Sequence, residues 1–290
     1  MDVEQFKIRE GAKVDLNEHP TDFTDNLSDK DAAREPLKQN IQRLSDLQDT
    51  LYAQNIYSLL IVLQAMDAAG KDSVVKHVMS GVNPEGCQVT SFKAPSAEEL
   101  DHDFLWRCQV ALPERGKIGI FNRSQYEEVL VVRVHPEILE AEQLPDDVKH
   151  SSDIWEQRYR QIRNWEDALF ENGIHVVKFF LHVSKDEQKK RFLARIDQPD
   201  KNWKFSSRDV KERGHWDDYM QAYVDAIEAT STEKAPWYII PADKKWFTRL
   251  SVSKVIVQKL ESMGLAYPKL SGAGLADLEE SKKLRQSEKT

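Results

Sequence analysis

Short runs of apolar residues recur along the chain, each of the length that a buried β-strand needs. The run at Ser58–Gln64 shows no alternation of apolar and polar residues and includes the β-branched pair Ile61 and Val62. Such a run is typical of a strand that is buried on both faces of a sheet. Comparable runs lie at Lys117–Phe121, Ile174–Val183 and Trp237–Pro241, and a weaker one lies at Gln88–Phe92. The pattern therefore predicts five strands.

The segments between these runs have the spacing of amphipathic helices. A helix entered near Pro36 has one apolar face, formed by Leu37, Ile41, Leu44, Leu47 and Leu51. Ser184 and Glu187 have the spacing of a capping box at the start of a later helix. Helical spacing is found at Asp72–Val82, Ala97–Ala111, Ile154–Glu171, Lys185–Ile196 and Trp246–Met263. Strands that alternate with helices of this length predict a three-layer α/β domain with a mostly parallel sheet.

Three stretches depart from this alternation. Residues 1–35 have no sustained period and are predicted to form an irregular extension before a single domain over residues 36–270. Inside that domain, residues 199–232 contain two helical stretches and no predicted strand. Residues 271–290 are charged and include Gly and Ser, so we expect a disordered tail there.

The composition is that of a globular protein, with 290 residues of which 40% are hydrophobic and 31% are charged. The most apolar stretch, Ile56–Met66, is shorter than the roughly 20 residues of a membrane span, so we expect no membrane segment. The N-terminus lacks the apolar core of a secretion signal. The two cysteines, Cys87 and Cys108, make neither a disulfide framework nor a zinc motif. We therefore expect a cytoplasmic protein.

The net charge of -8 argues against a non-specific nucleic-acid binder, and no nucleic-acid partner is expected. The charge is unevenly distributed along the chain. Residues 185–213 contain ten basic and six acidic residues, whereas residues 1–50 are strongly acidic. The basic stretch would attract a polyanion locally.

The segment Gln64–Ser73 leaves a predicted buried strand and enters a predicted helix, as phosphate-binding loops do. Gly70 and Lys71 match the standard pattern, in which backbone amides wrap a phosphate and the lysine neutralises its oxygens. Ala65 replaces the first glycine of that pattern, and Asp72, followed by Ser73, replaces the usual hydroxyl residue. An ordinary strand-to-helix turn is the alternative interpretation.

Asp67 lies inside this loop, where a carboxylate beside phosphates is costly unless a cation intervenes. We therefore expect Mg²⁺ near Asp67. The second predicted site follows the strand at Lys117–Phe121, where Asn122 replaces the acidic residue that many phosphate-loop kinases have there. Arg123 adds a charge that can reach a phosphate, with Glu127 and Glu128 one helical turn later. The alternative is a helix cap with a surface arginine.

A basic and aromatic stretch inside residues 199–232 stands where kinases have a lid that closes on phosphates. A solvated helix face is the alternative interpretation. Trp203, Trp216 and Trp237 could stack a base, although packing in a core or a hinge is their commoner role. The basic residues predicted to belong to the lid are Lys201, Lys204, Arg208, Lys211 and Arg213.

Taken together, these motifs resemble the polyphosphate kinase 2 family, which moves phosphate between inorganic polyphosphate and nucleotides. The resemblance extends from about residue 50 to residue 265. It rests on four blocks in the family's order, namely Gln64–Ser73, Phe121–Val131, Lys201–Ser206 and Ser231–Tyr238 with Pro241–Asp243.

The resemblance implies a P-loop kinase core like that of thymidylate kinase, a helical lid, Mg²⁺ and a basic channel for polyphosphate. Asn122 and the residues after it resemble the class that phosphorylates both AMP and ADP. Carried over to this chain, the catalytic residues would be Asp67, Lys71, Asn122 and Arg123. Phosphate- and nucleotide-binding residues would be Ala68, Ala69, Gly70, Asp72, Ser73, Glu127 and Glu128. Gln125 departs from the family pattern, and homo-oligomers are usual in the family.

The resulting prediction is a transferase that moves the terminal phosphoryl group of polyphosphate to AMP or ADP, giving ADP or ATP. An ATP-dependent nucleotide kinase would use the same loop, metal and lid, and its donor preference would distinguish it. A non-catalytic nucleotide-binding module would explain the missing glycine at Ala65 and the missing acid at Asn122. That module would bind nucleotide without turnover.

Overall fold

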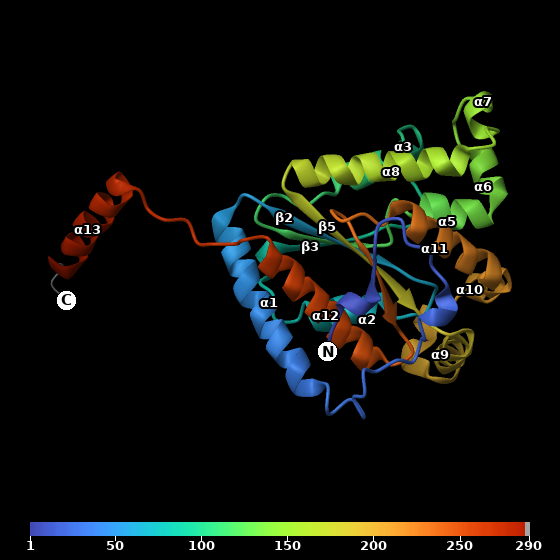
Figure 1. Ribbon diagram of the computed structural model, residues 1–290, viewed down its shortest axis with the longest axis horizontal. Coiled ribbons are helices and arrows are strands. Elements are labelled where there is room, and N and C mark those ends of the chain that lie inside the picture. Colours follow the sequence, from blue (N-terminus) through green and yellow to red (C-terminus); the bar gives the residue numbers. More distant parts are fainter. Residues whose placement is uncertain (288–290) are drawn as a thin grey trace.

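A six-stranded sheet forms the centre of the molecule (Figure 1). The computed structural model describes residues 1–287, without the side chains of Lys204, Ser207 and Arg208. All neighbouring strands are parallel except the first pair, which is antiparallel. Across the sheet the order is β1 (Lys7–Ile8), β6 (Trp237–Pro241), β5 (Ile174–His182), β2 (Ser58–Gln64), β4 (Ile118–Asn122) and β3 (Cys87–Ser91).

Strand β2 is central, and every residue of it is buried, as its uninterrupted apolar run predicts. Its register places Leu63 beside Asn122 of β4 on one side and beside Phe179 of β5 on the other. The carboxyl ends of three strands therefore meet at one edge of the sheet. Ligands of doubly wound folds bind at such an edge.

Helices cover both faces of the sheet, which confirms the predicted three-layer arrangement (Figure 1). On one face α1 (Arg34–Gln54), α2 (Lys71–Val78) and α12 (Lys245–Ser262) pack together. The other face carries α5 (Glu127–Val134), α8 (Ile154–Glu171) and α11 (Trp216–Thr230).

The N-terminal extension is less irregular than predicted. Lys7 and Ile8 pair with β6 and add an edge strand to the sheet. The backbone oxygen of Ile8 accepts a hydrogen bond from Ser231 Oγ at 2.6 Å. Phe6 is buried and packs edge-on against Phe247 of α12. These contacts join residues that are more than 200 positions apart, so no local pattern indicates them.

The helix predicted at Ala97–Ala111 is wrong, because the segment forms α3 (Ala97–Leu100) and α4 (Trp106–Val110) with a turn between them. Asp103 makes this turn, since its side chain accepts from the amide of Leu105 at 2.9 Å. Two further short helices, α6 (Pro136–Ala141) and α7 (Asp146–Lys149), connect α5 to α8 and were not predicted.

Residues 272–287 form α13 (Gly272–Ser287) where the sequence predicts a disordered tail. Leu, Ala, Glu, Lys and Arg are good helix formers, and their preference outweighs the polar composition of this stretch. The last three residues of the predicted tail, 288–290, lie outside the described part of the chain. No helix among the described residues is long and apolar enough to cross a membrane.

The region predicted as a lid, residues 199–232, contains helices and no strand, in agreement with the sequence pattern over its described part. It follows α9 (Lys185–Asp197) and begins with two short helices, η4 (Pro199–Lys204) and α10 (Ser207–Glu212), and the turn η5 (Arg213–His215). Its second half, α11, is part of the core, with Tyr223 and Ile227 buried. We call residues 199–215 the lid segment.

Candidate active site

The loop between β2 and α2 has the backbone geometry of a phosphate-binding loop. Gly70 has a φ of 119°, which L side chains rarely adopt, and it caps the N-terminus of α2. Ala68 is left-handed with a φ of 59°, a conformation that is uncommon outside glycine and concentrated at functional sites. This arrangement directs the helix N-terminus, with its unpaired amides, toward the edge of the sheet.

Lys71 is the first residue of α2, and its side chain folds back along the loop. Its Nζ donates to the backbone oxygen of Ala65 at 2.7 Å. Burial lowers the pKa of Lys71, and the nearby Arg123 lowers it further. A bound phosphate would offset both effects, because its oxygens bring negative charge to these two neighbouring cations. Lys71 therefore lies on the phosphate loop, and its role in neutralising phosphate stays a prediction.

Arg123 follows β4 and reaches across to the phosphate loop. Its φ of 66° is left-handed, which places the side chain over the loop. One guanidinium nitrogen lies 2.9 Å from Asp67 Oδ1 and another lies 3.1 Å from Glu127 Oε2. Burial alone would lower the pKa of Arg123, but the two carboxylates raise it above its usual value. Arg123 is thus 39% exposed and is held at the phosphate loop by two carboxylates.

Two further predicted residues contact each other at the start of α2. Asn122 Nδ2 donates to Asp72 Oδ1 at 2.8 Å. Ser73, next along the helix, accepts a hydrogen bond from Arg249 of α12 at 2.8 Å. The phosphate loop therefore has a basic neighbour on α12 that the sequence analysis missed.

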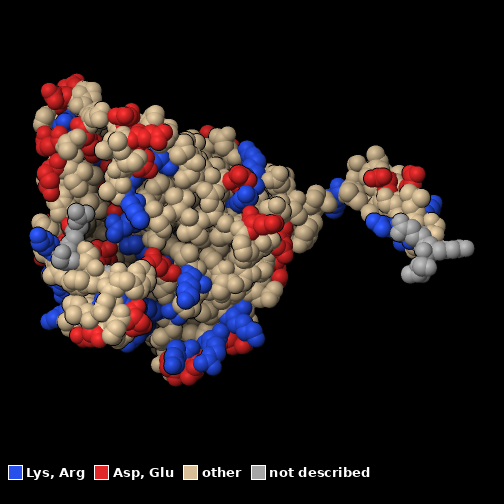
Figure 2. Space-filling model, turned by 180° about the vertical axis from the view of Figure 1, so that it is seen from behind, with Lys and Arg blue, Asp and Glu red and all other residues tan. Residues whose placement is uncertain are grey.

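A cavity of about 1360 Å³ opens beside Asp67 and Arg123. Its walls also include Glu127 and Glu128, two of the predicted ligand-binding residues, and Lys211 of the lid segment. Figure 2 shows Lys and Arg side chains in and around a hollow on one face, and Asp and Glu side chains over the corner where α6 and α7 lie. The cavity is large enough for a nucleotide.

Glu128 forms part of the buried wall of this cavity. It lies 3.7 Å from both Arg107 and Arg158, which are also buried. Burial raises the pKa of Glu128 to about 7 despite these two arginines. Glu128 is therefore paired with protein cations, whereas Glu127 contacts Arg123 directly.

The predicted lid cations are not all directed to one place. Lys201 is exposed, and the side chains of Lys204 and Arg208 lie outside the described part of the structure. Arg213 turns away from the cavity and donates to the backbone oxygen of Lys185 and to Gln188 Oε1, at 2.6 and 2.9 Å. Only Lys211 among the described lid cations lines the cavity.

Sequence reasoning missed Arg191, which lies directly behind the phosphate loop. Its guanidinium donates to the backbone oxygens of Ala68 and Ala69 at 3.0 and 2.7 Å, and to those of Ala242 and Asp243. Its Nε binds Glu187, so Glu187 does not complete the predicted capping box, although Ser184 does cap α9. The position of Arg191 in a basic segment was the only signal in the sequence.

Lys245, at the start of α12, is a second missed cation. Burial lowers the pKa of Lys245, and the positive charges of Arg191 and Arg249 lower it further. A lysine whose pKa is lowered by neighbouring cations favours an anionic ligand. The paired basic residues after Pro241–Asp243 are the sequence signal that could have indicated it.

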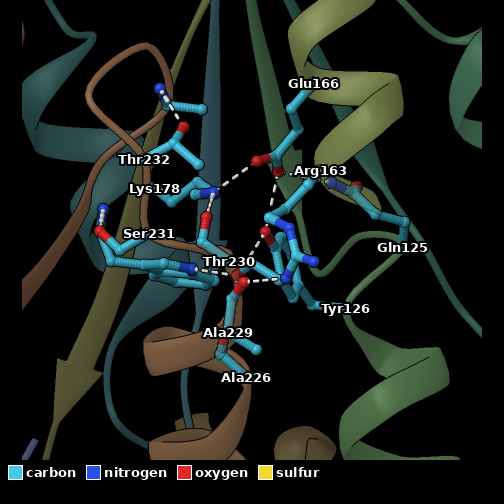
Figure 3. Close-up of polar contacts among 12 residues, drawn as sticks. Gln125, Tyr126, Arg163, Glu166, Lys178, Ala226, Ala229, Thr230, Ser231 and Thr232 are labelled. Carbon is cyan, nitrogen blue, oxygen red and sulfur yellow. Dashed lines mark hydrogen bonds and ion pairs between the residues drawn. The ribbon is translucent and has the colours of Figure 1, made fainter. Parts of the chain in front are cut away.

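A buried ion pair supports the loop that contains Arg123 (Figure 3). Lys178 of β5 and Glu166 of α8 are in contact at 2.5 Å, and both are almost fully buried. Tyr126 donates to Glu166 at 2.8 Å, and Gln125 Nε2 lies 3.4 Å from the same carboxylate. Gln125, which departs from the family's sequence pattern, is thus part of this hydrogen-bond network. Trp237, adjacent to it, donates to Thr230 and is a core residue.

The site fits a metal ion that is held largely by substrate. No group of three or more His, Cys, Asp or Glu side chains that could hold a metal occurs among the described residues. Asp67 nevertheless places one carboxylate at the mouth of the phosphate loop, beside Arg123. Mg²⁺ in kinases is commonly bound by one or two carboxylates together with the phosphates of the substrate. Asp67 is suited to such a role.

A mostly parallel sheet with a phosphate loop after its central strand, flanked by Lys71, Arg123 and a large cavity, defines a P-loop kinase. The family model "Polyphosphate kinase 2 (PPK2)" matches residues 27–267. The chain belongs to the polyphosphate kinase 2 family. The family and fold class predicted from the sequence motifs are thereby confirmed.

Known relatives are similar over almost the whole chain. An ADP-polyphosphate phosphotransferase from Rhodopseudomonas palustris is 55% identical, covering 95% of this chain and 96% of the relative. An AMP/ADP-polyphosphate phosphotransferase from Meiothermus ruber is 42% identical, over 92% of this chain and 96% of the relative. In the crystal structure of polyphosphate kinase 2 from Arthrobacter aurescens TC1, the sequence is 40% identical to this chain. The match covers 97% of this chain and 96% of that chain, with a TM-score of 0.87.

Proposed function

We propose that the protein transfers the terminal phosphoryl group of inorganic polyphosphate to ADP and AMP, giving ATP and ADP. The names of the relatives support this donor and these acceptors. The observation that carries the proposal is the pair of cations, Lys71 and Arg123, that meet at the phosphate loop beside a cavity of nucleotide size.

The two substrates would approach the loop from different sides. The acceptor nucleotide would occupy the 1360 Å³ cavity, with its terminal phosphate near Arg123. Polyphosphate would lie along the cations on the α12 side of the loop, beginning with Lys71 and with Arg249, which contacts Ser73. A chain of phosphates needs an extended series of cations, because each phosphate adds negative charge that must be neutralised.

The chemistry would be in-line displacement at the terminal phosphorus of polyphosphate. An oxygen of the acceptor's terminal phosphate would attack this phosphorus, and the bridging P–O bond would break to release polyphosphate shortened by one phosphate. The acceptor oxygen belongs to a phosphate that is already ionised, so no strong general base is needed. Rate acceleration would come from aligning the two phosphates and from neutralising charge on the transferring group by Lys71 and Arg123. Mg²⁺, held by Asp67 and substrate phosphates, would supply further neutralisation of phosphate charge.

The choice between acceptors is a finer proposal. Asn122 resembles the class that uses both AMP and ADP, and the Meiothermus ruber relative is named for both nucleotides. The relative from Rhodopseudomonas palustris is named for ADP alone. We propose that both nucleotides are accepted. The two free cysteines, Cys87 and Cys108, fit the predicted cytoplasmic location, and a homo-oligomer stays a prediction.

The test of the proposal is a comparison of phosphate donors. Purified protein with Mg²⁺ is incubated with long-chain polyphosphate plus AMP or ADP, and separately with ATP plus AMP, and the nucleotides are resolved. We expect ATP from ADP, and ADP followed by ATP from AMP, only when polyphosphate is present. Turnover with ATP plus AMP alone would favour the nucleotide kinase, and no turnover in either mixture would favour the binding module.

A further inference from the structure

Three consecutive backbone carbonyls of the phosphate loop are held by side chains of α9. Gln188 Nε2 donates to the oxygen of Asp67 at 3.0 Å, and Arg191 donates to the oxygens of Ala68 and Ala69. In a trans peptide the C=O and the following N–H point in opposite directions. By fixing the carbonyls toward α9, these two side chains direct the amides of Ala68 and Gly70 toward the opposite side of the loop.

Gln188 differs from Arg191 in what its other end contacts. Arg191 also binds the oxygens of Ala242 and Asp243, so it joins the phosphate loop to the chain just after β6. Gln188 Oε1 instead accepts a hydrogen bond from Arg213 of the lid segment at 2.9 Å. Gln188 is only 1% exposed, and both polar atoms of its amide are used in these two bonds.

A continuous series of contacts therefore runs from the lid segment to the site. Arg213 donates to Gln188, which donates to the backbone of Asp67, and the side chain of Asp67 accepts from Arg123. An amide whose oxygen is held can present its nitrogen in only one direction. Loss of the Arg213 contact would free Gln188 to rotate and would release the carbonyl of Asp67.

We propose that Gln188 is a positioning residue that couples the place of Arg213 in the lid segment to the geometry of the phosphate loop. The proposal rests on the proposed phosphoryl transfer, since that reaction provides the assay. Gln188 lies on the outer side of the loop and acts through Asp67 rather than on the phosphates. The proposal predicts that the lid segment influences turnover through Gln188, in addition to any direct contact of the lid segment with polyphosphate.

The first test removes the amide without removing its volume. Gln188→Leu leaves the carbonyl of Asp67 and the guanidinium of Arg213 without this partner. Gln48→Leu is a matched control, because Gln48 is also a glutamine that is 1% exposed, on α1 and outside the site. With ADP, polyphosphate and Mg²⁺, we expect Gln188→Leu to lower kcat about tenfold or more, with KM for ADP changed about threefold at most. The control should keep the wild-type kcat.

The second test asks whether Arg213 acts through Gln188. Arg213→Met and the double variant with Gln188→Leu complete a double-mutant cycle. We expect the double variant to have nearly the same kcat as Gln188→Leu alone, because both changes break one series of contacts. If the fold-losses in kcat of the two single variants multiply in the double variant, Arg213 acts independently of Gln188, for example by binding polyphosphate. That result would overturn the coupling.

A third measurement does not depend on turnover. Amide hydrogen exchange across residues 67–73 should be faster in both Gln188→Leu and Arg213→Met than in the wild type and in Gln48→Leu. If the wild-type protein fails with polyphosphate but turns over ATP and AMP, the proposed donor is wrong and the same variants are compared with ATP. Unchanged exchange together with a wild-type kcat in Gln188→Leu would refute the positioning role.

Discussion

The guanidinium of Arg123 lies 2.9 Å from the carboxylate of Asp67, although the two residues are 56 positions apart. They meet because β2 and β4 are adjacent and parallel, so the loops that follow both strands begin at the same edge of the sheet. The contact places an acid and a base where the transferring phosphate would be bound. If Arg123 binds the phosphate instead of Asp67, the carboxylate of Asp67 becomes available to bind a metal ion.

The role of Asp67 can be tested through the metal dependence of turnover. Asp67→Asn keeps the size of the side chain but removes the negative charge that would hold Mg²⁺. We expect the Mg²⁺ concentration for half-maximal rate to rise about tenfold or more. If Asp67 serves only to hold Arg123, kcat will fall while the Mg²⁺ requirement stays the same. Asp46→Asn, on the surface of α1, provides the control.

Lys71 should be needed for turnover because its ammonium group lies 2.7 Å from a carbonyl oxygen at the start of the phosphate loop, where it can neutralise a bound phosphate. Lys71→Ala is expected to lower kcat/KM by about 10²–10³, as the removal of a charged stabiliser does elsewhere. Lys76→Ala, which changes an exposed lysine on the same helix, should have little effect. Initial rates with ADP and polyphosphate measure both variants. A Lys71→Ala protein that retains more than about a tenth of the wild-type activity would contradict the assignment.

Glu128 should make the stability of the protein depend on pH. Burial raises its pKa from 4.5 to about 7, so the unfolded chain loses this proton at a lower pH than the folded chain. The wild type should therefore lose stability relative to Glu128→Gln as the pH rises from 4.5 to 7, by about 3 kcal/mol at most. Above that window the difference should be constant.

The measurement for Glu128 is urea unfolding of both proteins at several pH values across this window. The comparison between the two proteins removes the contribution of all other titrating groups that they share. A difference in the free energy of unfolding that does not change with pH would show that Glu128 ionises normally beside Arg107 and Arg158.

The buried pair of Lys178 and Glu166 should be important for stability. Lys178→Met leaves the carboxylate of Glu166 buried without its counter-ion, which we expect to lower the free energy of unfolding by about 3–5 kcal/mol. The double variant Lys178→Met/Glu166→Gln should recover much of this loss, because no buried charge is left and the amide oxygen can still accept from Tyr126. Denaturant unfolding at pH 7 measures both.

The exposed pair of Arg34 and Asp31 offers a matched comparison for this prediction. These side chains are in contact at 2.7 Å on the surface, where ion pairs contribute little. Arg34→Met should leave the free energy of unfolding almost unchanged. Equal effects at both pairs would show that the Lys178–Glu166 pair contributes no more than a surface ion pair.

Much of the fold could be predicted because it depends on local patterns. The strands at Ser58–Gln64 and Trp237–Pro241 and the helix at Ile154–Glu171 have the predicted bounds, since apolar runs and helical periods are local properties of the chain. The helix at Ala97–Ala111 was wrong because one side chain, that of Asp103, turned the backbone. The tail predicted at residues 271–290 differs over α13, because its Leu, Ala, Glu and Lys residues favour a helix despite the polar composition.

The loop chemistry could likewise be predicted from the sequence. The motif of Gly70 and Lys71 after a buried strand can be recognised from the order of residues alone. The same is true of Asn122 and Arg123 after β4. The sequence could not indicate that Arg123 reaches Asp67, or that Arg213 turns to Gln188 instead of the cavity. Those contacts depend on which strands are adjacent and on how α9 packs behind the loop.

The sequence by itself therefore determined the class of the domain, the phosphate loop and the family, because periodicity and short motifs are encoded locally. Only the tertiary structure decided which charges meet. Helix α9 lies far along the chain from the loop, yet it packs against the loop and brings Arg191 and Gln188 into the site. The energy of such contacts depends on burial and on distances of a few ångströms, and neither is written in the order of residues.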